Sequence, residues 1–154
     1  MYQKSILRKK YLNLRKRKYC AINKEFFDSF LSFVKSNFKK KNLNLALYYP
    51  TSFEINVLKI LENKSMIDKN ILLPVIEKNN VMNFFSWKKN NVLLVNKFGI
   101  LEPVKSKIKI PDIILVPILA FDRNKCRLGY GKGFYDRYLN KYLKKFSNIL
   151  TVGV

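Results

Sequence analysis

Hydrophobic positions repeat along this chain at intervals of three to four residues in several segments. In residues 3–19, Leu7, Tyr11 and Leu14 form a narrow apolar stripe on an otherwise basic segment, which predicts a helix. Lys4 and Arg8 lie one turn apart on that helix and point the same way. We expect the following cations, Arg15 to Lys18, to form a solvated surface. The same spacing predicts helices over residues 23–39, 53–63 and 134–145, the second of these three capped by Thr51 and Ser52.

Short apolar runs between Pro, Asn and Gly residues predict strands. The run from Ile113 passes through Pro117 to Phe121 without polar alternation, which is typical of a strand covered on both faces in a parallel sheet. Asn79-Asn80 between two runs predicts a hairpin. The aromatic cluster at 84–87 is more typical of a core than of a ligand platform. Further strands are predicted over residues 45–49, 71–76, 83–87, 92–95 and 148–154.

The order of these elements predicts the fold class. Helices and strands succeed one another as α-α-β-α-β-β-(β)-β-loop-α-β, which indicates an α/β protein, a three-layer α/β/α sandwich with a mostly parallel sheet. The length of 154 residues predicts a single domain. In such sheets ligands bind at the carboxyl ends of the strands, so the segment directly after the long apolar run is the first place to look for a site.

That segment is rich in glycine. The whole chain has five glycines, and three of them, Gly129, Gly131 and Gly133, alternate here. The pattern fits neither a Walker loop nor GxGxxG. Exposed amides before a helix, with cations beside them, nevertheless favour an anion cradle over a merely tight turn. The flanking cations are Arg127, Lys132 and Arg137.

Composition narrows the chemistry. The chain has no histidine, so an imidazole base or a histidine-ligated metal is excluded. Cys20 and Cys126 form no CxxC motif. No apolar run is long enough for a membrane span and the N-terminus lacks a signal-peptide core, so we expect a cytoplasmic protein without a membrane partner. The net charge of +21 comes mostly from Lys, and we interpret it as a solvated basic surface rather than a dedicated nucleic-acid face.

The stretch from Arg127 to Arg137, RLGYGKGFYDR, together with Phe121-Asp122, resembles the signature of the 5-formyltetrahydrofolate cyclo-ligase (methenyltetrahydrofolate synthetase) family. Supporting segments occur in the family's order along nearly the whole chain. They are Lys4-x-x-Leu7-Arg8, Tyr49-Pro50 with Glu54, Leu73-Pro74, Gly99-Ile100-x-Glu102-Pro103 and Val116-Pro117-x-Leu119-Ala120-Phe121-Asp122. The resemblance implies the fold class of ribose-phosphate isomerase-like and CoA-transferase-like domains.

The resemblance also implies an activity and a site. The family converts 5-formyltetrahydrofolate and MgATP to 5,10-methenyltetrahydrofolate, ADP and phosphate. Arg127 and Lys132 are the expected catalytic cations, Asp136 the Mg²⁺ ligand, and Arg8, Tyr49, Glu54 and Gly131 the folate contacts. The implied ATP-binding residues are Lys4, Arg8, Arg127, Leu128, Gly129, Tyr130, Gly131, Lys132, Gly133, Phe134 and Tyr135. The expected folate is the monoglutamate or a polyglutamylated form, and we expect a monomer.

Two departures from the family pattern matter. Lys125 stands where a glycine is usual, so the turn after Asp122 is expected to differ. Cyclo-ligases continue past the last predicted strand and supply a further acidic metal ligand, whereas this chain ends at Val154. Either the sequence is shortened, or the protein is reduced and its metal binding weakened. The alternative function is a catalytically impaired, cyclo-ligase-like binding protein, with RNA as a candidate ligand of its basic surface.

Overall fold

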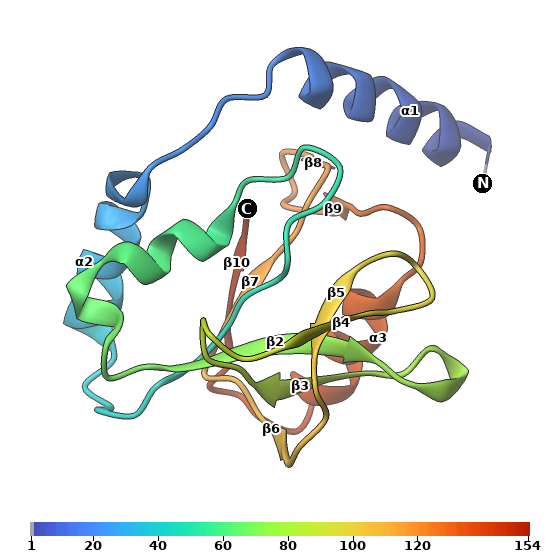
Figure 1. Cartoon of the computed structure of the whole chain (residues 1–154). Helices are drawn as coiled ribbons and strands as arrows, with labels where there is room; N and C mark the ends of the chain where they lie inside the picture. Colours follow the sequence, from blue (N-terminus) through green and yellow to red (C-terminus); the bar gives the residue numbers. More distant parts are fainter. Residues whose placement is uncertain (1) are drawn as a thin grey trace.

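A six-stranded sheet forms the centre of the protein in a computed structural model that describes residues 2–154 (Figure 1). In spatial order its strands are β10 (Leu150–Gly153), β7 (Ile113–Val116), β1 (Asn44–Ala46), β2 (Asn70–Ile76), β3 (Met82–Ser86) and β6 (Ile108–Lys109). The first four run parallel, and β3 pairs antiparallel with both β2 and β6. The predicted mostly parallel sheet is confirmed.

Helices cover both faces of this sheet, as the α/β interpretation predicts. On one face lie α2 (Asp28–Asn37), the 3₁₀ turn η1 (Lys24–Phe27) before it, and two further 3₁₀ turns, η2 (Val57–Glu62) and η3 (Lys64–Met66). On the other face lies α3 (Phe134–Tyr142). Side chains of β7 alternate between the two cores: Ile113 and Leu115 enter the first, Ile114 and Val116 the second. Burying each contributes roughly 1.5–3 kcal/mol.

The predicted helix over 53–63 is wrong. The chain there turns through Ser52 and Phe53, both with positive φ, and then forms only the 3₁₀ segment η2, which Asn56 caps by accepting from the Leu58 amide. The apolar residues used for the prediction are spaced by three, which is the period of a 3₁₀ helix rather than of an α-helix. Thr51 and Ser52 therefore cap no helix.

Two predicted strands are shorter than expected because of proline. The long apolar run ends as a strand at Val116, since Pro117 cannot donate to the ladder, and the chain then enters a separate hairpin of β8 (Ala120–Phe121) and β9 (Arg127–Leu128). The strand predicted at 45–49 is β1 alone, followed by a last bond from the Leu47 amide to Leu72. The ladder between β1 and β2 stops there, because Pro74 on β2 has no N–H to donate the next hydrogen bond.

The turns between strands agree with their sequences. Asn79 and Asn80 both have φ of 58° in the η4 turn (Lys78–Asn80) that joins β2 to β3, which confirms the hairpin. Lys125 has φ of 62° between β8 and β9, so it adopts the backbone conformation that a glycine would favour. A further hairpin joins β4 (Leu93–Val95) to β5 (Leu101–Pro103). The aromatic cluster at 84–87 is core, as expected, with Phe84, Phe85 and Trp87 all buried.

The first helix, α1 (Tyr2–Arg17), lies beside the β8–β9 hairpin, apart from both sheet faces (Figure 1). Its predicted apolar stripe is not buried: Leu7 is 40% and Leu14 41% exposed. Its arginines instead contact backbone carbonyls: Arg8 contacts Gly129 in the glycine-rich loop, and Arg15 contacts Ile118 after β7. None of the helices within residues 2–154 combines the length and hydropathy that crossing a bilayer requires.

Candidate active site

A cavity of about 640 Å³ opens where β1, β2 and β7 end. Its walls come from segments that follow these strands and from the glycine-rich stretch before α3. Of the predicted site residues, the structure places Tyr49, Glu54, Arg127, Gly129, Tyr130, Gly131, Lys132, Gly133, Phe134, Tyr135 and Asp136 in its lining. This cavity thus lies at the carboxyl edge of the parallel sheet, where the fold class predicts a site.

The glycine-rich loop passes under the first helix. Arg8 donates from Nε to the Gly129 carbonyl at 2.9 Å, and its Cζ lies only 3.1 Å from the position that a Cβ on Gly131 would occupy. Gly131 also has φ of +100°, which side-chain-bearing residues rarely adopt. The backbone therefore favours a glycine at 131, and a side chain there would also have to displace the Arg8 guanidinium by a few tenths of an ångström.

Glu54 is a buried carboxylate, 7% exposed, in the lining of the cavity. The Thr51 amide donates to its Oε2 at 2.7 Å and the Thr51 hydroxyl at 3.2 Å. Burial raises the pKa of Glu54, while the bonds from Thr51, the nearby Tyr130 hydroxyl and the charge of Arg15 oppose that rise. The positive φ values of Ser52 and Phe53 make the tight turn that places Glu54 there.

Tyrosines surround this carboxylate. Tyr48, Tyr130 and Tyr135 each have a raised pKa, first because burial disfavours the phenolate and next because Glu54 is close. Tyr48 donates to the Ile55 carbonyl at 3.1 Å, whereas the buried Tyr135 hydroxyl has no hydrogen-bond partner among residues 2–154. The neutral hydroxyls leave Glu54 as the anionic group among these side chains.

Arg127 and Asp136 form an ion pair in the lining of the same cavity. Arg127 donates to Asp136 through Nη2 and to the Pro117 carbonyl through Nη1 at 3.2 Å. Its guanidinium also lies 5.9 Å from the centre of the Tyr135 ring. Asp136 is in the first turn of α3, where the helix dipole favours a negative charge. A side chain predicted to counter phosphate charge and one predicted to hold metal therefore face each other.

The β4–β5 hairpin completes the wall beside the glycine-rich loop. The Phe98 ring at its tip lies 5.5 Å from Phe134, and Lys132 Nζ lies 5.3 Å from the centre of Phe98. Glu102 accepts from the Ile76 amide at 3.2 Å and from Asn96 at 3.0 Å, so this carboxylate fastens the hairpin to the sheet. Gly99 and Ile100 line the cavity, where the family pattern expects them.

Three predicted nucleotide-binding residues lie outside the cavity lining. Lys4 is exposed on α1, one turn before Arg8, and Leu128 belongs to β9, where its carbonyl accepts from Leu119. Arg8 reaches the glycine-rich loop from above.

The residues present fit one kind of metal binding. Between residues 2 and 154, no group of three or more acidic or cysteine side chains is arranged to hold an ion. Asp136 is therefore a single carboxylate at the cavity wall, 66% exposed. Mg²⁺ commonly binds through one or two carboxylates and the phosphates of a nucleotide, so Asp136 suits an ion that arrives with its nucleotide rather than one held by the protein alone.

A family model described as the 5-formyltetrahydrofolate cyclo-ligase family matches residues 2–153. This chain belongs to that family. It is 35% identical over 127 residues to the probable 5-formyltetrahydrofolate cyclo-ligase of Schizosaccharomyces pombe, covering 74% of this chain and 62% of the relative. It is 34% identical over 118 residues to the 5-formyltetrahydrofolate cyclo-ligase of Haemophilus influenzae, covering 72% and 62%. The chain thus spans less than two thirds of either relative.

Solved structures show the same fold. The NMR structure of the Aquifex aeolicus 5,10-methenyltetrahydrofolate synthetase superposes with a TM-score of 0.67 at 33% identity, covering 98% of this chain and 76% of that one. A 5,10-methenyltetrahydrofolate synthetase from Mycoplasma pneumoniae superposes with a TM-score of 0.65 at 22% identity, covering 90% and 77%. The α/β architecture of this cyclo-ligase family member is therefore confirmed.

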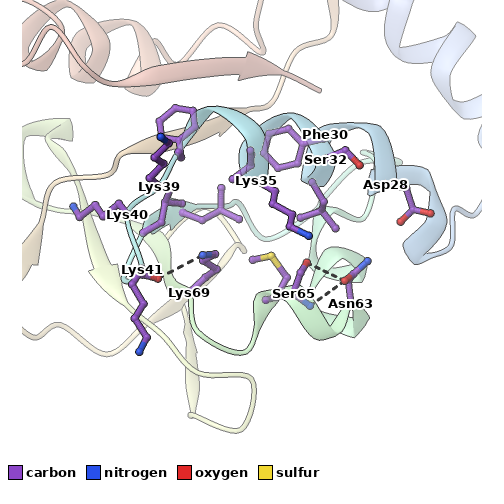
Figure 2. A pocket seen from close by; sticks show the side chains of 16 residues that line it. Asp28, Phe30, Ser32, Lys35, Lys39, Lys40, Lys41, Asn63, Ser65 and Lys69 are labelled. Carbon is purple, nitrogen blue, oxygen red and sulfur yellow. Dashed lines mark hydrogen bonds between the residues drawn. The ribbon is translucent and has the colours of Figure 1, made fainter.

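A second cavity, of about 750 Å³, lies at the opposite, amino-terminal ends of β1 and β2 (Figure 2). Its floor is the apolar face of α2 with Met66, and its lysines are Lys35, Lys39, Lys40, Lys41 and Lys69. Lys40 pairs with Asp112 at 2.9 Å. The cyclo-ligase signature residues that the structure describes lie at the other end of the sheet, so we assign the site to the smaller cavity.

Sequence reasoning missed several residues of the candidate site. Tyr48, Thr51 and Asn96 line the cavity or fix its walls, and their signal was only their closeness to predicted residues. Arg15 was expected to be solvated, but it is half-buried and donates to the Tyr130 hydroxyl and the Ile118 carbonyl. Its position seven residues after Arg8, two turns along the same face, was the available signal.

Proposed function

We propose that this chain catalyses the ATP-dependent conversion of 5-formyltetrahydrofolate to 5,10-methenyltetrahydrofolate, with release of ADP and phosphate. One observation carries the proposal: Glu54 and the cationic glycine-rich loop face a single cavity large enough for a drug-sized ligand. A carboxylate suits the N–H donors of a pterin edge, and loop amides with cations suit phosphates. The family to which the chain belongs is named for this reaction.

The chemistry starts from an unreactive formamide, because its nitrogen lone pair is delocalised into the carbonyl. The formyl oxygen attacks the γ-phosphate of ATP, which forms an imidate phosphate and releases ADP. N10 of the folate then adds to the activated carbon and loses its proton, and inorganic phosphate leaves. Phosphoryl transfer depends on positioning and charge neutralisation, so a protein without histidine can catalyse it.

The residues divide between the two substrates. Amides from Gly129 to Gly133 hold the triphosphate, and Arg127 and Lys132 counter the charge that develops on the transferred group. Asp136 would hold the Mg²⁺, which supplies further charge neutralisation when bound. On the folate side, Glu54 accepts from the pterin while Tyr49 packs against it, and Arg8 and Gly131 lie where both ligands meet. The remaining predicted contacts are Lys4, Leu128, Tyr130, Phe134 and Tyr135.

The decisive experiment mixes the protein with 5-formyltetrahydrofolate and MgATP and follows the absorbance of the methenyl product. We expect a signal that requires ATP and is accompanied by one ADP per product. A folded sample without ATP-dependent product would contradict the proposal.

The basic surface would favour polyglutamylated folates, so we expect a lower KM for them than for the monoglutamate. The single domain, the cytoplasmic location and the monomeric state all stay predictions. Gel filtration can check the monomeric state.

A further inference from the structure

Arg15 joins three segments that are distant in sequence. Its Nη1 donates to the Tyr130 hydroxyl in the glycine-rich loop, and its Nη2 donates to the Ile118 carbonyl, which follows β7. The guanidinium also lies 5.9 Å from the centre of the Tyr130 ring. Arginine presents several N–H groups in one plane, so a single side chain makes both bonds at fixed geometry.

The first helix depends on such contacts. Ile6, Leu7 and Leu14 are 51%, 40% and 41% exposed, so apolar burial contributes little to holding α1 on the body. Arg8 anchors the helix at Gly129, and Arg15 anchors it two turns later at Tyr130 and Ile118. The two arginines reach different parts of the site: Arg8 reaches the glycine-rich loop backbone, and Arg15 reaches the side with the buried carboxylate.

The polar groups around Glu54 come from four different segments, and Arg15 adds a positive charge to them. Tyr48 faces it from the end of β1, Thr51 from its own turn, Tyr130 from the glycine-rich loop and Tyr135 from α3. Arg15 on α1 is the cation whose charge lowers the pKa of Glu54. Tyr130 accepts a hydrogen bond from Arg15 and lines the same cavity as Glu54, and burial together with the charge of Glu54 raises the pKa of the Tyr130 hydroxyl, so Tyr130 lies between the two.

We propose that Arg15 is a positioning residue for folate: acting through Tyr130, it holds the Glu54 carboxylate in place for the N–H donors of the pterin. This inference rests on the proposed function and assigns it a residue outside the family signature. Arg15 is not among the residues that line the cavity, so the proposal gives it no direct contact with either substrate. By fixing the Glu54 carboxylate, Arg15 would favour a ligand edge rich in hydrogen-bond donors, because the carboxylate accepts from donors and repels acceptors.

The test compares Arg15→Gln, Arg15→Lys and Tyr130→Phe with Arg17→Gln, a change of an exposed cation on the same helix. Arg15→Gln should raise the KM for 5-formyltetrahydrofolate roughly ten- to hundredfold, with the KM for ATP changed less than about threefold. Without the cation, Glu54 takes up a proton at higher pH, so the acidic limb of kcat/KM for folate should move to higher pH. Arg15→Lys should keep that limb near its original pH.

Tyr130→Phe should raise the folate KM similarly. The variant that carries both Arg15→Gln and Tyr130→Phe should have a smaller increase in folate KM than the two single effects combined, because Arg15 acts through Tyr130. Equal increases in both KM values for Arg15→Gln would mean that Arg15 only anchors α1, and would overturn the proposal, as would an unmoved pH profile. Titration calorimetry of 5-formyltetrahydrofolate at two pH values provides a readout without turnover. A wild-type protein that neither binds folate nor turns over refutes the proposed function, whereas normal folate binding by Arg15→Gln refutes the role of Arg15 alone.

Discussion

Arg127 donates through Nη2 to Oδ1 of Asp136, across the loop that carries the three alternating glycines. The Arg127 side chain is 20% exposed and that of Asp136 66%, so the pair lies at the mouth of the cavity. Each partner keeps the other in position before ligands bind. Under the proposed function, a phosphate would offer Arg127 and a Mg²⁺ ion would offer Asp136 a stronger partner, so we expect the pair to open when MgATP enters.

Asp136→Asn should separate the functional and structural roles of that pair. An exposed ion pair stabilises by about 1 kcal/mol or less, so the free energy of unfolding should change little. Turnover should fall at least about a hundredfold, and the Mg²⁺ concentration needed for half-maximal rate should rise. Chemical denaturation and Mg²⁺ titrations of the rate measure the two effects. Ordinary turnover with an unchanged Mg²⁺ requirement would show that the metal ligand lies elsewhere.

Lys132 has a matched control in Lys97. Both ammonium groups lie over the Phe98 ring, at 5.3 and 5.2 Å from its centre, but of the two only Lys132 lines the cavity. Lys132→Ala should lower kcat about a hundredfold or more, because a cation facing the transferred phosphoryl group is lost. Lys97→Ala removes the same exposed cation–π contact and should cost less than about fivefold. Steady-state kinetics measures kcat for both variants. Comparable losses of kcat would show that the contact with Phe98, rather than a charge in the cavity, is responsible.

Gly131→Ala should damage both the backbone and the contact with Arg8. Alanine at positive φ costs about 1–2 kcal/mol, and its Cβ would lie 3.1 Å from Arg8 Cζ. Gly99→Ala is the control for stability, since Gly99 has φ of +74° with nothing within 4 Å of its Cβ. Thermal unfolding should show a larger loss for Gly131→Ala. In an Arg8→Ala background the difference should shrink, and a difference that persists would place the strain in the backbone alone.

The sequence was most informative where composition was unusual. Three alternating glycines in a glycine-poor chain located the loop, and the continuous apolar run located β7, because both depend on local chemistry. It failed where tertiary contacts decide. Leu7 and Leu14 have helical spacing but no core to pack against, and Arg15 becomes half-buried only because Ile118 and Tyr130 come together from distant segments. Contacts between residues that are distant in sequence leave no pattern in the local sequence.

The error at residues 53–63 has a related cause. A spacing of three is compatible with both helix types, and the choice between them lies in the turn before it, where Ser52 and Phe53 take positive φ. That turn is costly for residues with side chains, and it directs Glu54 into the cavity. Local propensity and function therefore disagree at this turn, which is where a prediction from propensity is expected to fail.

Glu54→Gln tests the balance between stability and function at that turn. Burial raises the pKa of Glu54 from its ordinary value of 4.5, so the folded state holds the proton more tightly than the unfolded state. The free energy of unfolding contributed by this group is therefore fully present below pH 4.5 and is lost as pH rises through the folded-state pKa. Glutamine carries no charge and can still accept from Thr51, so the variant should gain stability relative to wild type as pH rises.

At neutral pH we expect Glu54→Gln to be the more stable protein and the poorer enzyme. Its affinity for 5-formyltetrahydrofolate should fall roughly ten- to hundredfold, because a charge-assisted hydrogen bond is lost and an amide presents a donor to the pterin donors. Denaturant unfolding of both proteins at pH 4.5 and about pH 7, with calorimetric folate binding at neutral pH, measures both changes. A stability difference that does not vary with pH would show that Glu54 is not the buried, ionised carboxylate of the folate site.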